Sequence, residues 1–141
     1  MEKIAGLDGQ NKQGYSALRH AAGRGKRDCV RVLASGGADL HLQNTITGST
    51  ALTMACQEGH SEAAVILIEG GASMSQHNYR GYCPIHRAAL LDRAEVVRAL
   101  LGLGCDPDMV STCTCSNTVW GKVSQNMPST YLPFYSFVLY K

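Results

Sequence analysis

The chain repeats itself, and this internal repeat constrains the fold more than any other feature of its 141 residues. Three segments align without gaps from their first glycine, at Gly14, Gly48 and Gly81, which lie 34 and 33 residues apart. A fixed period of about 20 to 50 residues is typical of solenoids, in which each unit buries its apolar surface against its neighbours. We therefore expect one folded unit made of three copies of a short supersecondary element.

Each copy carries the pattern of two short helices. Two residues after its first glycine, each copy carries Ser16, Thr50 or Cys83, and apolar residues at helical spacing follow. Ser and Thr at this place accept hydrogen bonds from the free N–H groups of a first helical turn. A second amphipathic run follows, and a glycine-containing pair closes the copy, where a helix end commonly needs a left-handed residue. The second runs place Val30 with Leu33, Ala64 with Leu67, and Val97 with Leu100 on one helix face.

The copies resemble the ankyrin repeat, a unit of about 33 residues with a Thr-Pro-Leu-His-x-Ala signature. The corresponding segments are 16–21, 50–55 and 83–88, and the third retains both Pro84 and His86. The resemblance implies an all-α ankyrin-repeat solenoid, in which helix-turn-helix units stack and loops project from one side. The Gly-His pair that precedes the second helix in the family is intact at Gly59-His60, altered at Gly25-Lys26 and replaced by Asp92-Arg93.

The sequence after the third copy departs from the family. A fourth copy would place its glycine near position 114, where Thr114 stands, and residues 109–141 contain no Asp or Glu. This is not the polar capping repeat that usually shields the end of a solenoid. We hypothesise that the chain is an isoform or fragment of a longer ankyrin-repeat protein, with a foreign, irregular tail that is disordered or loosely docked. The expected division is a lead-in or partial repeat at 1–13, repeats at 14–47, 48–80 and 81–108, and the tail at 109–141.

Cys83 and His86 lie three residues apart, which raises the question of a metal or catalytic site. A zinc site needs four ligands, and a cysteine nucleophile needs an orienting group, and the neighbouring sequence offers neither. Cys83 instead aligns with the capping residues Ser16 and Thr50, and as a thiol it is predicted to be a poorer cap by about 1 kcal/mol. Pro84 then falls at the first helical position, which tolerates a missing N–H. In the family that the copies resemble, the histidine at this position makes structural hydrogen bonds.

The other cysteines are also interpreted as structural. Cys29, Cys56 and Cys105 occupy positions where the family normally carries Val or Ala, so we expect small buried core residues. Cysteines without a secretory signal do not predict a disulfide framework. Cys113 and Cys115, with Cys105 nearby, leave a soft-metal site open as an alternative. No second Cys or His pair at a recognised spacing supports that site, so we expect neither a metal nor a cofactor.

Charge and hydropathy limit the classes of partner. Lys and Arg number 13 against 11 Asp and Glu, which gives no reason to expect nucleic acid or an anionic membrane as the main partner. The longest apolar run, 63–68, has six residues, whereas a membrane span needs about 20. Residues 1–13 lack the apolar core of a secretory signal peptide. We therefore expect an intracellular protein, in the cytoplasm, the nucleus or both.

A cluster of basic residues around the first repeat defines an alternative function, the binding of phosphate or nucleic acid. Arg19 and Arg24 belong to the first predicted helix and Arg31 to the second, so they need not share one face. Asp28 and Glu58 offer compensating charge. A solvated or protein-binding surface is therefore favoured over nucleic acid. The cluster consists of Arg19, Arg24, Lys26, Arg27 and Arg31.

The resemblance implies a non-catalytic module, a scaffold or adaptor and not an enzyme, that binds another protein through loop tips and exposed first-helix positions. Tyr and Arg are enriched at binding hot spots, so Tyr79, Arg80 and Tyr82 are the predicted anchors. Leu90 and Leu91 either face the partner or pack against whatever follows the third copy. Neither the partner's identity nor an oligomeric state follows from the sequence. The predicted partner-binding residues are Tyr15, Arg24, Ile46, Gln57, Glu58, Tyr79, Arg80, Tyr82, Leu90 and Leu91.

Overall fold

The computed structural model describes residues 6–106, and within that range it contains six α-helices and no strand. Each helix has seven to nine residues, too short to be stable alone, so packing between neighbours must stabilise it. The expectations for residues 109–141, including the pair Cys113 and Cys115, lie outside the described residues. The helices are α1 (Ala17–Gly23), α2 (Arg27–Ser35), α3 (Ala51–Glu58), α4 (Ser61–Glu69), α5 (Pro84–Leu90) and α6 (Ala94–Gly102).

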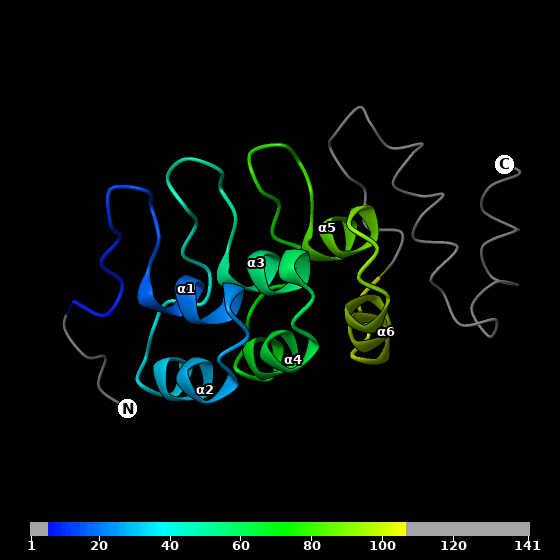
Figure 1. The fold of residues 1–141 in the computed structure, drawn as a ribbon, viewed down its shortest axis with the longest axis horizontal. Helices are drawn as coiled ribbons and strands as arrows, with labels where there is room; N and C mark the ends of the chain where they lie inside the picture. Colours follow the sequence, from blue (N-terminus) through cyan, green and yellow to red (C-terminus); the bar gives the residue numbers. More distant parts are fainter. Residues whose placement is uncertain (1–5, 107–141) are drawn as a thin grey trace, which may run out of the picture.

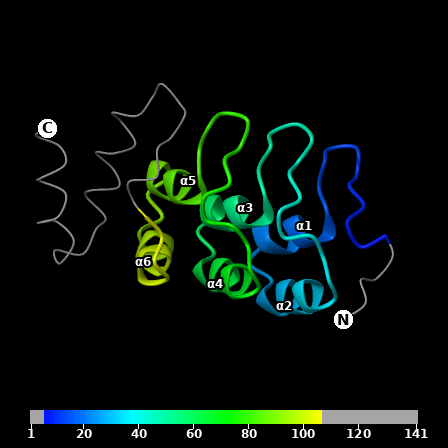
Figure 2. The ribbon, with the colours of Figure 1, turned by 180° about the vertical axis from the view of Figure 1, so that it is seen from behind.

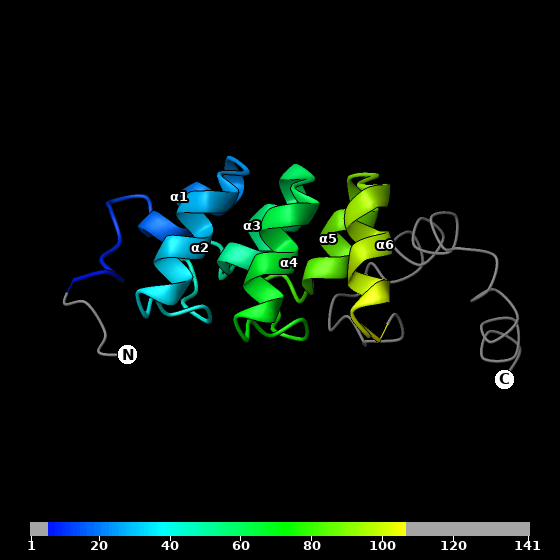
Figure 3. The ribbon, with the colours of Figure 1, turned by 90° about the horizontal axis from the view of Figure 1, so that it is seen from below.

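The helices form two layers, each of which takes one helix from every repeat. α1, α3 and α5 lie side by side in one layer, and α2, α4 and α6 form the other (Figures 1 and 2). Seen from below, the three helix pairs follow one another along the long axis of the molecule (Figure 3). The loops at 36–50 and 70–83 project together from the side of the α1, α3 and α5 layer, beside the segment before α1. The predicted all-α solenoid of stacked helix-turn-helix units is therefore confirmed.

The first helix of each repeat begins at the predicted capping residue. The Ser16 and Thr50 hydroxyls accept hydrogen bonds from the backbone N–H three residues further on, at 3.2 and 3.3 Å. The Cys83 thiol donates to a loop carbonyl 3.6 Å away, and the Nδ1 atom of His86 accepts from the Cys83 N–H at 3.2 Å. Pro84 is the first residue of α5. Cys83 and His86 thus occupy structural positions at a helix start.

Adjacent repeats are joined at the turns between their helices. The Nε2 atom of His60 lies 3.1 Å from the carbonyl oxygen of Gly23 in the preceding repeat. Arg93 replaces this histidine in the third repeat, and its Nε donates to the equivalent carbonyl, that of Gln57, at 3.0 Å. Asp92 takes the left-handed conformation, with φ at 58°, that a glycine provides in the other two repeats. The altered Gly-His pair therefore keeps the junction between repeats by different chemistry.

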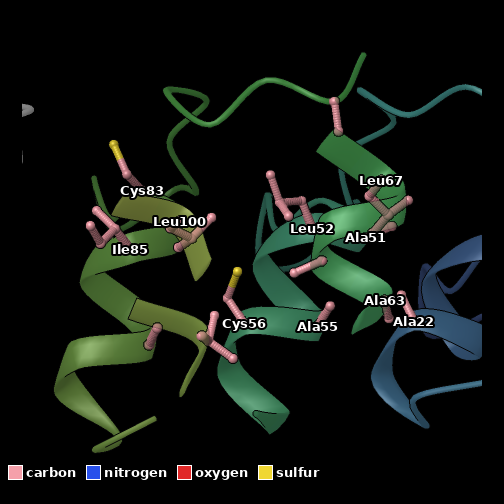
Figure 4. Packing of buried hydrophobic residues seen from close by; sticks show 14 of the residues in the cluster. Ala22, Ala51, Leu52, Ala55, Cys56, Ala63, Leu67, Cys83, Ile85 and Leu100 are labelled. Atoms are coloured by element: carbon pink, nitrogen blue, oxygen red, sulfur yellow. The ribbon is translucent and has the colours of Figure 1, made fainter. Parts of the chain in front are cut away.

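The core runs without interruption between the two layers (Figure 4). Leu18, Leu52 and Ile85 hold equivalent positions on α1, α3 and α5, and each is at most 2% exposed. Burying a side chain of this size contributes about 1.5 to 3 kcal/mol of transfer free energy. Cys56 and Cys105 are buried in the same cluster, as the sequence predicted.

The prediction that Cys29 is buried is wrong, since its side chain is exposed. The equivalent residues Ala63 and Val96 are buried, because the second helix of the preceding repeat lies against them. Within residues 6–106, no such helix precedes α2, so Cys29 faces the uncovered end of the stack. Val32, on the same helix, is 70% exposed. Repeat position alone therefore does not determine burial in the first repeat.

Candidate functional site

The projecting loops are tied to one another by hydrogen bonds. The side-chain amide of Gln10 donates to the Gln43 carbonyl at 2.8 Å, and that of Gln43 donates to the His77 carbonyl at 2.9 Å. The Tyr79 N–H donates to the Thr47 carbonyl at 3.0 Å. Because these bonds connect each loop to the next, the loop tips form a fixed row and not three independent segments.

An asparagine shapes the turn of each loop. Asn11 and Asn78 each accept two hydrogen bonds, from the backbone N–H groups two and four residues further on, at 2.9 to 3.0 Å. Asn44 lies between them in the sequence and is 1% exposed. Asparagine bonds in this way to the backbone that follows it, which makes it a common turn residue. The first and third loop tips therefore share one turn, whereas in the second loop Asn44 accepts from the N–H groups two and three residues further on.

A groove lies between the loop tips and the layer of α1, α3 and α5. It consists of two adjoining cavities of about 580 and 490 Å³. Two exposed apolar side chains, Ile46 (65% exposed) and Tyr79 (64%), project from the loops beside it. Exposed apolar side chains that lie together beside a groove are typical of a binding surface. The cavities share Tyr15, Arg19, Ile46, Thr47 and Met54.

The structure brings together most of the residues that the sequence predicted for partner binding. They come from the segment before α1, the ends of α1 and α3, and two loops. Glu58, Tyr82, Leu90 and Leu91 do not line the groove. The predicted residues that line it are Tyr15, Arg24, Ile46, Gln57, Tyr79 and Arg80.

The expectation that Tyr82 is exposed is wrong, since only 9% of its surface is accessible. Its backbone N–H is held by Asn78, and the Arg87 guanidinium carbon lies 6.0 Å from the centre of its ring. Leu90 packs against the core, whereas Leu91, at the C-terminal end of α5, is 40% exposed. Of the three anchors predicted in the third repeat, only Tyr79 and Arg80 are exposed.

Several residues of the groove were missed as partner-binding candidates, among them Arg19, Met54 and Arg87. All three lie on the first helix of a repeat, one or more turns away from the loop tips. The internal alignment contains a signal for Arg19, since it corresponds to His86 and departs from the family signature. Met54 and Arg87 each lie one residue after the histidine position of the signature, which Thr53 and His86 occupy. This spacing places them on the helix face toward the loops.

The basic cluster of the first repeat divides between two surfaces. Arg19 and Arg24 line the groove. On the outer layer, Arg27 pairs with Glu62 at 2.8 Å, and Arg31 lies 3.4 Å from a carboxylate on its own helix. Phosphate-driven binding of a nucleic acid depends on several cations that face one strand. These residues do not form such a surface, which is consistent with the sequence-based preference against nucleic acid.

The groove is electropositive. Arg19, Arg24, Arg80 and Arg87 contribute to its lining, and no Asp or Glu does so among the residues that the structure describes. Arg87 donates to the side-chain oxygen of Gln57 at 2.7 Å. The whole chain has a net charge of only +2, so this concentration of arginines is local to the groove.

No metal centre is found in the described part of the chain, and its buried thiols are unreactive. Between residues 6 and 106, no three His, Cys, Asp or Glu side chains are placed to hold a metal ion. Burial raises the pKa of Cys83 to about 11 and that of Cys105 to about 12, so both thiols stay protonated at neutral pH. No described helix is long and apolar enough to pass through a bilayer.

Comparison with known families agrees with this architecture. A family model described as Ankyrin repeats (3 copies) matches residues 18–111, which is more than half of the chain. The chain belongs to the ankyrin-repeat family. Ankyrin repeats mediate interactions between proteins, and in this chain the groove combines loop tips and first helices from all three ankyrin repeats.

Similar ankyrin-repeat segments occur in proteins of different kinds. The nuclear factor NF-kappa-B p105 subunit of Gallus gallus is 31% identical over 102 residues, which are 72% of this chain and 10% of that protein. Protein phosphatase 1 regulatory subunit 27 of Mus musculus is 38% identical over 78 residues, 55% of this chain and 50% of that protein. The chain therefore spans half or less of the length of these relatives, and the likeness concerns the repeats.

Proposed function

We propose that this chain is a non-catalytic protein-interaction module that holds a segment of another protein in the groove. The observation that carries the proposal is the convergence of Tyr15, Ile46, Tyr79 and Arg80 on one groove from separate loops. Hydrogen bonds between the loops fix the backbone that carries these side chains before a partner arrives, which lowers the entropy lost on binding. Aromatic and arginine side chains in such a position are typical binding hot spots.

The relatives support the non-catalytic part of the proposal. Two of the similar proteins, from Mus musculus, are named regulatory subunits 12A and 27 of protein phosphatase 1. Regulatory subunits act through the proteins to which they bind. We extend that mode of action to this chain, but we do not extend the identity of the partner. We also propose a cytoplasmic or nuclear location, a choice supported by the similarity to a protein named a nuclear factor.

We further propose that the chain corresponds to part of a longer ankyrin-repeat protein, as an isoform or fragment. The small share of p105 that the repeats cover, 10%, supports this origin. The foreign sequence would begin at about Met109. Transcript sequencing tests this point, because we expect an exon boundary at that codon. A single exon that reads through the Met109 codon, in related genes as well, contradicts it.

The groove is tested by affinity capture with the full chain. The double variant Ile46→Ser, Tyr79→Ser removes two exposed apolar side chains from the groove, and we expect it to reduce capture of the partner by at least about tenfold. Val32→Ser is the matched control, since it removes an apolar side chain that is 70% exposed on the outer layer. Captured proteins are quantified by mass spectrometry. Equal capture by the double variant and the parent chain rejects the groove as the binding site.

A further inference from the structure

Arg19 occupies a position at which the other two repeats carry neutral side chains. It aligns with Thr53 and His86, at the fourth residue of the ankyrin signature. The hydroxyl of Thr53 lies 3.2 Å from that of Thr50, and His86 accepts from the Cys83 N–H, so each bonds to the start of its own helix. A guanidinium has no acceptor and cannot take the role of His86, and the Arg19 side chain makes no hydrogen bond to Ser16 either. Arg19 therefore does not serve the structural purpose of this position.

The guanidinium of Arg19 is buried without an anionic partner. The residue is 6% exposed, and its Nε and Nη1 atoms have no hydrogen-bond partner. Its charge lies over the Tyr15 ring, 4.3 Å from the ring centre, and Nη2 lies 3.8 Å from the sulfur of Met54, a weak acceptor. Burial lowers the pKa of Arg19, as for a cation removed from water, while the neighbouring Tyr15 hydroxyl acts in the opposite direction. No carboxylate of residues 6–106 pairs with it.

Arg19 lines both cavities of the groove, whose other charged side chains are the cations of Arg24, Arg80 and Arg87. A buried cation with unused donors is complementary to an anion that brings acceptors with it. We propose that the groove binds an acidic segment of a partner protein, and that Arg19 holds one Asp or Glu carboxylate of that segment. This inference rests on the proposed function, since it names the chemistry of the partner that the groove receives.

The neighbours of Arg19 explain how a carboxylate reaches it. Met54 is partly exposed, and its unbranched thioether adopts other rotamers at little cost. When its sulfur moves aside, Nη2 is opened to the groove, and a carboxylate forms a charge-assisted hydrogen bond in place of the weak contact to sulfur. Tyr15 stays beneath the guanidinium and fixes its plane. Arg24 and Arg80, both exposed at the rim, attract the acidic segment at longer range.

The first experiment selects peptides against the full chain. A random library of peptides of about 12 residues is suitable, because such a peptide spans about 40 Å when extended. We expect the selected peptides to share an Asp or Glu at one fixed position, and to lose binding to the Ile46→Ser, Tyr79→Ser variant. Peptides that depend on Ile46 and Tyr79 but share no acidic residue overturn the role of Arg19 and leave the proposed function in place. A selection that yields no groove-dependent peptide contradicts both.

A double-mutant cycle then assigns the acidic residue to Arg19. In a selected peptide, the change of its shared Glu to Gln, or of a shared Asp to Asn, should weaken binding to the parent chain by about tenfold to a hundredfold. The same change should have little effect on binding to Arg19→Thr, because the cation that the carboxylate would contact is absent. Threonine is chosen because Thr53 occupies this position in the second repeat. Arg31→Gln, which removes an arginine of the outer layer, is the control, and it should preserve the effect of the peptide change. An effect that persists in Arg19→Thr overturns the assignment.

Two further measurements separate this role from a structural one and from phosphate binding. Arg19→Thr should melt at the same temperature as the parent chain or higher, because it removes an unpaired buried cation. A lower melting temperature, together with an undiminished peptide effect, identifies a structural arginine. A phosphoserine in place of the shared acidic residue should not improve binding, and inorganic phosphate should not compete. Tighter binding of the phosphopeptide by about tenfold would reassign the site to phosphate.

Discussion

The side chain of Asn44 joins two projecting loops. Its Nδ2 atom donates to the carbonyl oxygens of Gln13 and Gly14 in the preceding loop, at 2.8 and 2.6 Å. Its Oδ1 atom accepts from the backbone N–H groups of Ile46 and Thr47, at 2.9 and 2.8 Å. Ile46 and Thr47 line the groove, so one buried amide both positions a wall of the site and stabilises the stack.

Replacement of Asn44 should therefore be more destabilising than replacement of its counterpart Asn11. Asn44→Ala removes four hydrogen bonds to backbone groups and should lower the free energy of unfolding by about 3 kcal/mol. Asn11 is exposed and bonds only within its own loop, so Asn11→Ala should cost about 1 kcal/mol. Urea unfolding followed by circular dichroism measures both. Equal losses would show that the link between the loops contributes nothing beyond turn formation.

Local features of this fold could be predicted from the sequence because they depend on short-range chemistry. A hydroxyl before an apolar run indicates a cap wherever the repeat lies, so Ser16 and Thr50 were assigned correctly. Burial depends on what packs from outside the repeat. Tyr15 and Tyr82 hold equivalent positions, yet the first is partly exposed and lines the groove, while the second is buried. Repeat position could not distinguish between them.

Charge in the groove was difficult to predict for a related reason. The sequence placed Arg19 in a basic cluster with its chain neighbours, whereas the fold separates it from Arg27 and Arg31 and brings it toward Arg80. The residues that meet in the groove lie one or two repeats apart in the chain, so only the stacking of repeats reveals them. The departure of Arg19 from the signature was visible in the sequence, but its lack of a partner was not.

Gly48 should be intolerant of a side chain for two separate reasons. Its φ is +70°, a conformation that costs an alanine about 1 kcal/mol, and an added Cβ would lie 2.4 Å from the Cδ1 atom of Tyr79. Gly48→Ala should thus cost about 2 kcal/mol or more and displace the tyrosine from the groove. Gly104, with φ at +84° and no atom within 4 Å of an added Cβ, supplies the control for backbone strain.

The steric part of this effect is isolated in a Tyr79→Ala background. There, Gly48→Ala should cost no more than Gly104→Ala costs in the parent chain, because the ring that the new methyl group meets is absent. Chemical unfolding of the five proteins (the parent chain, the three single variants and the double variant) measures the difference. If Gly48→Ala is equally costly with and without the Tyr79 ring, the clash is not the cause.

Cys29 should be the first cysteine of the described repeats to react with iodoacetamide. It is exposed, whereas Cys56, Cys83 and Cys105 are buried, and alkylation requires an accessible thiolate. Brief labelling at pH 8 followed by peptide mapping should modify Cys29 at least about a hundredfold faster than Cys56, since the latter reacts only through opening of the repeat. Similar rates at Cys29 and Cys56 would mean that α3 opens readily.

The buried thiols should make the protein less stable in alkaline solution. Burial raises the pKa of Cys56, and raises those of Cys83 and Cys105 to about 11 and about 12. In the unfolded chain these thiols lose their protons above about pH 8.5, while in the folded chain they retain them. The unfolded state then binds fewer protons, so the free energy of unfolding is highest below pH 8.5 and falls as the pH rises above it.

Cys56→Ala tests this relationship. Each buried thiol adds about 1.4 kcal/mol per pH unit to the decline once the unfolded chain is fully ionised at that site. Between about pH 9.5 and 10.5, the free energy of unfolding of Cys56→Ala should therefore fall less steeply than that of the parent chain, by about that amount. Val97→Ala, which trims a buried side chain that carries no titratable group, should keep the parent slope. Urea unfolding across this pH range provides the slopes, and parallel curves for Cys56→Ala and the parent chain would exclude Cys56 as a source of the decline.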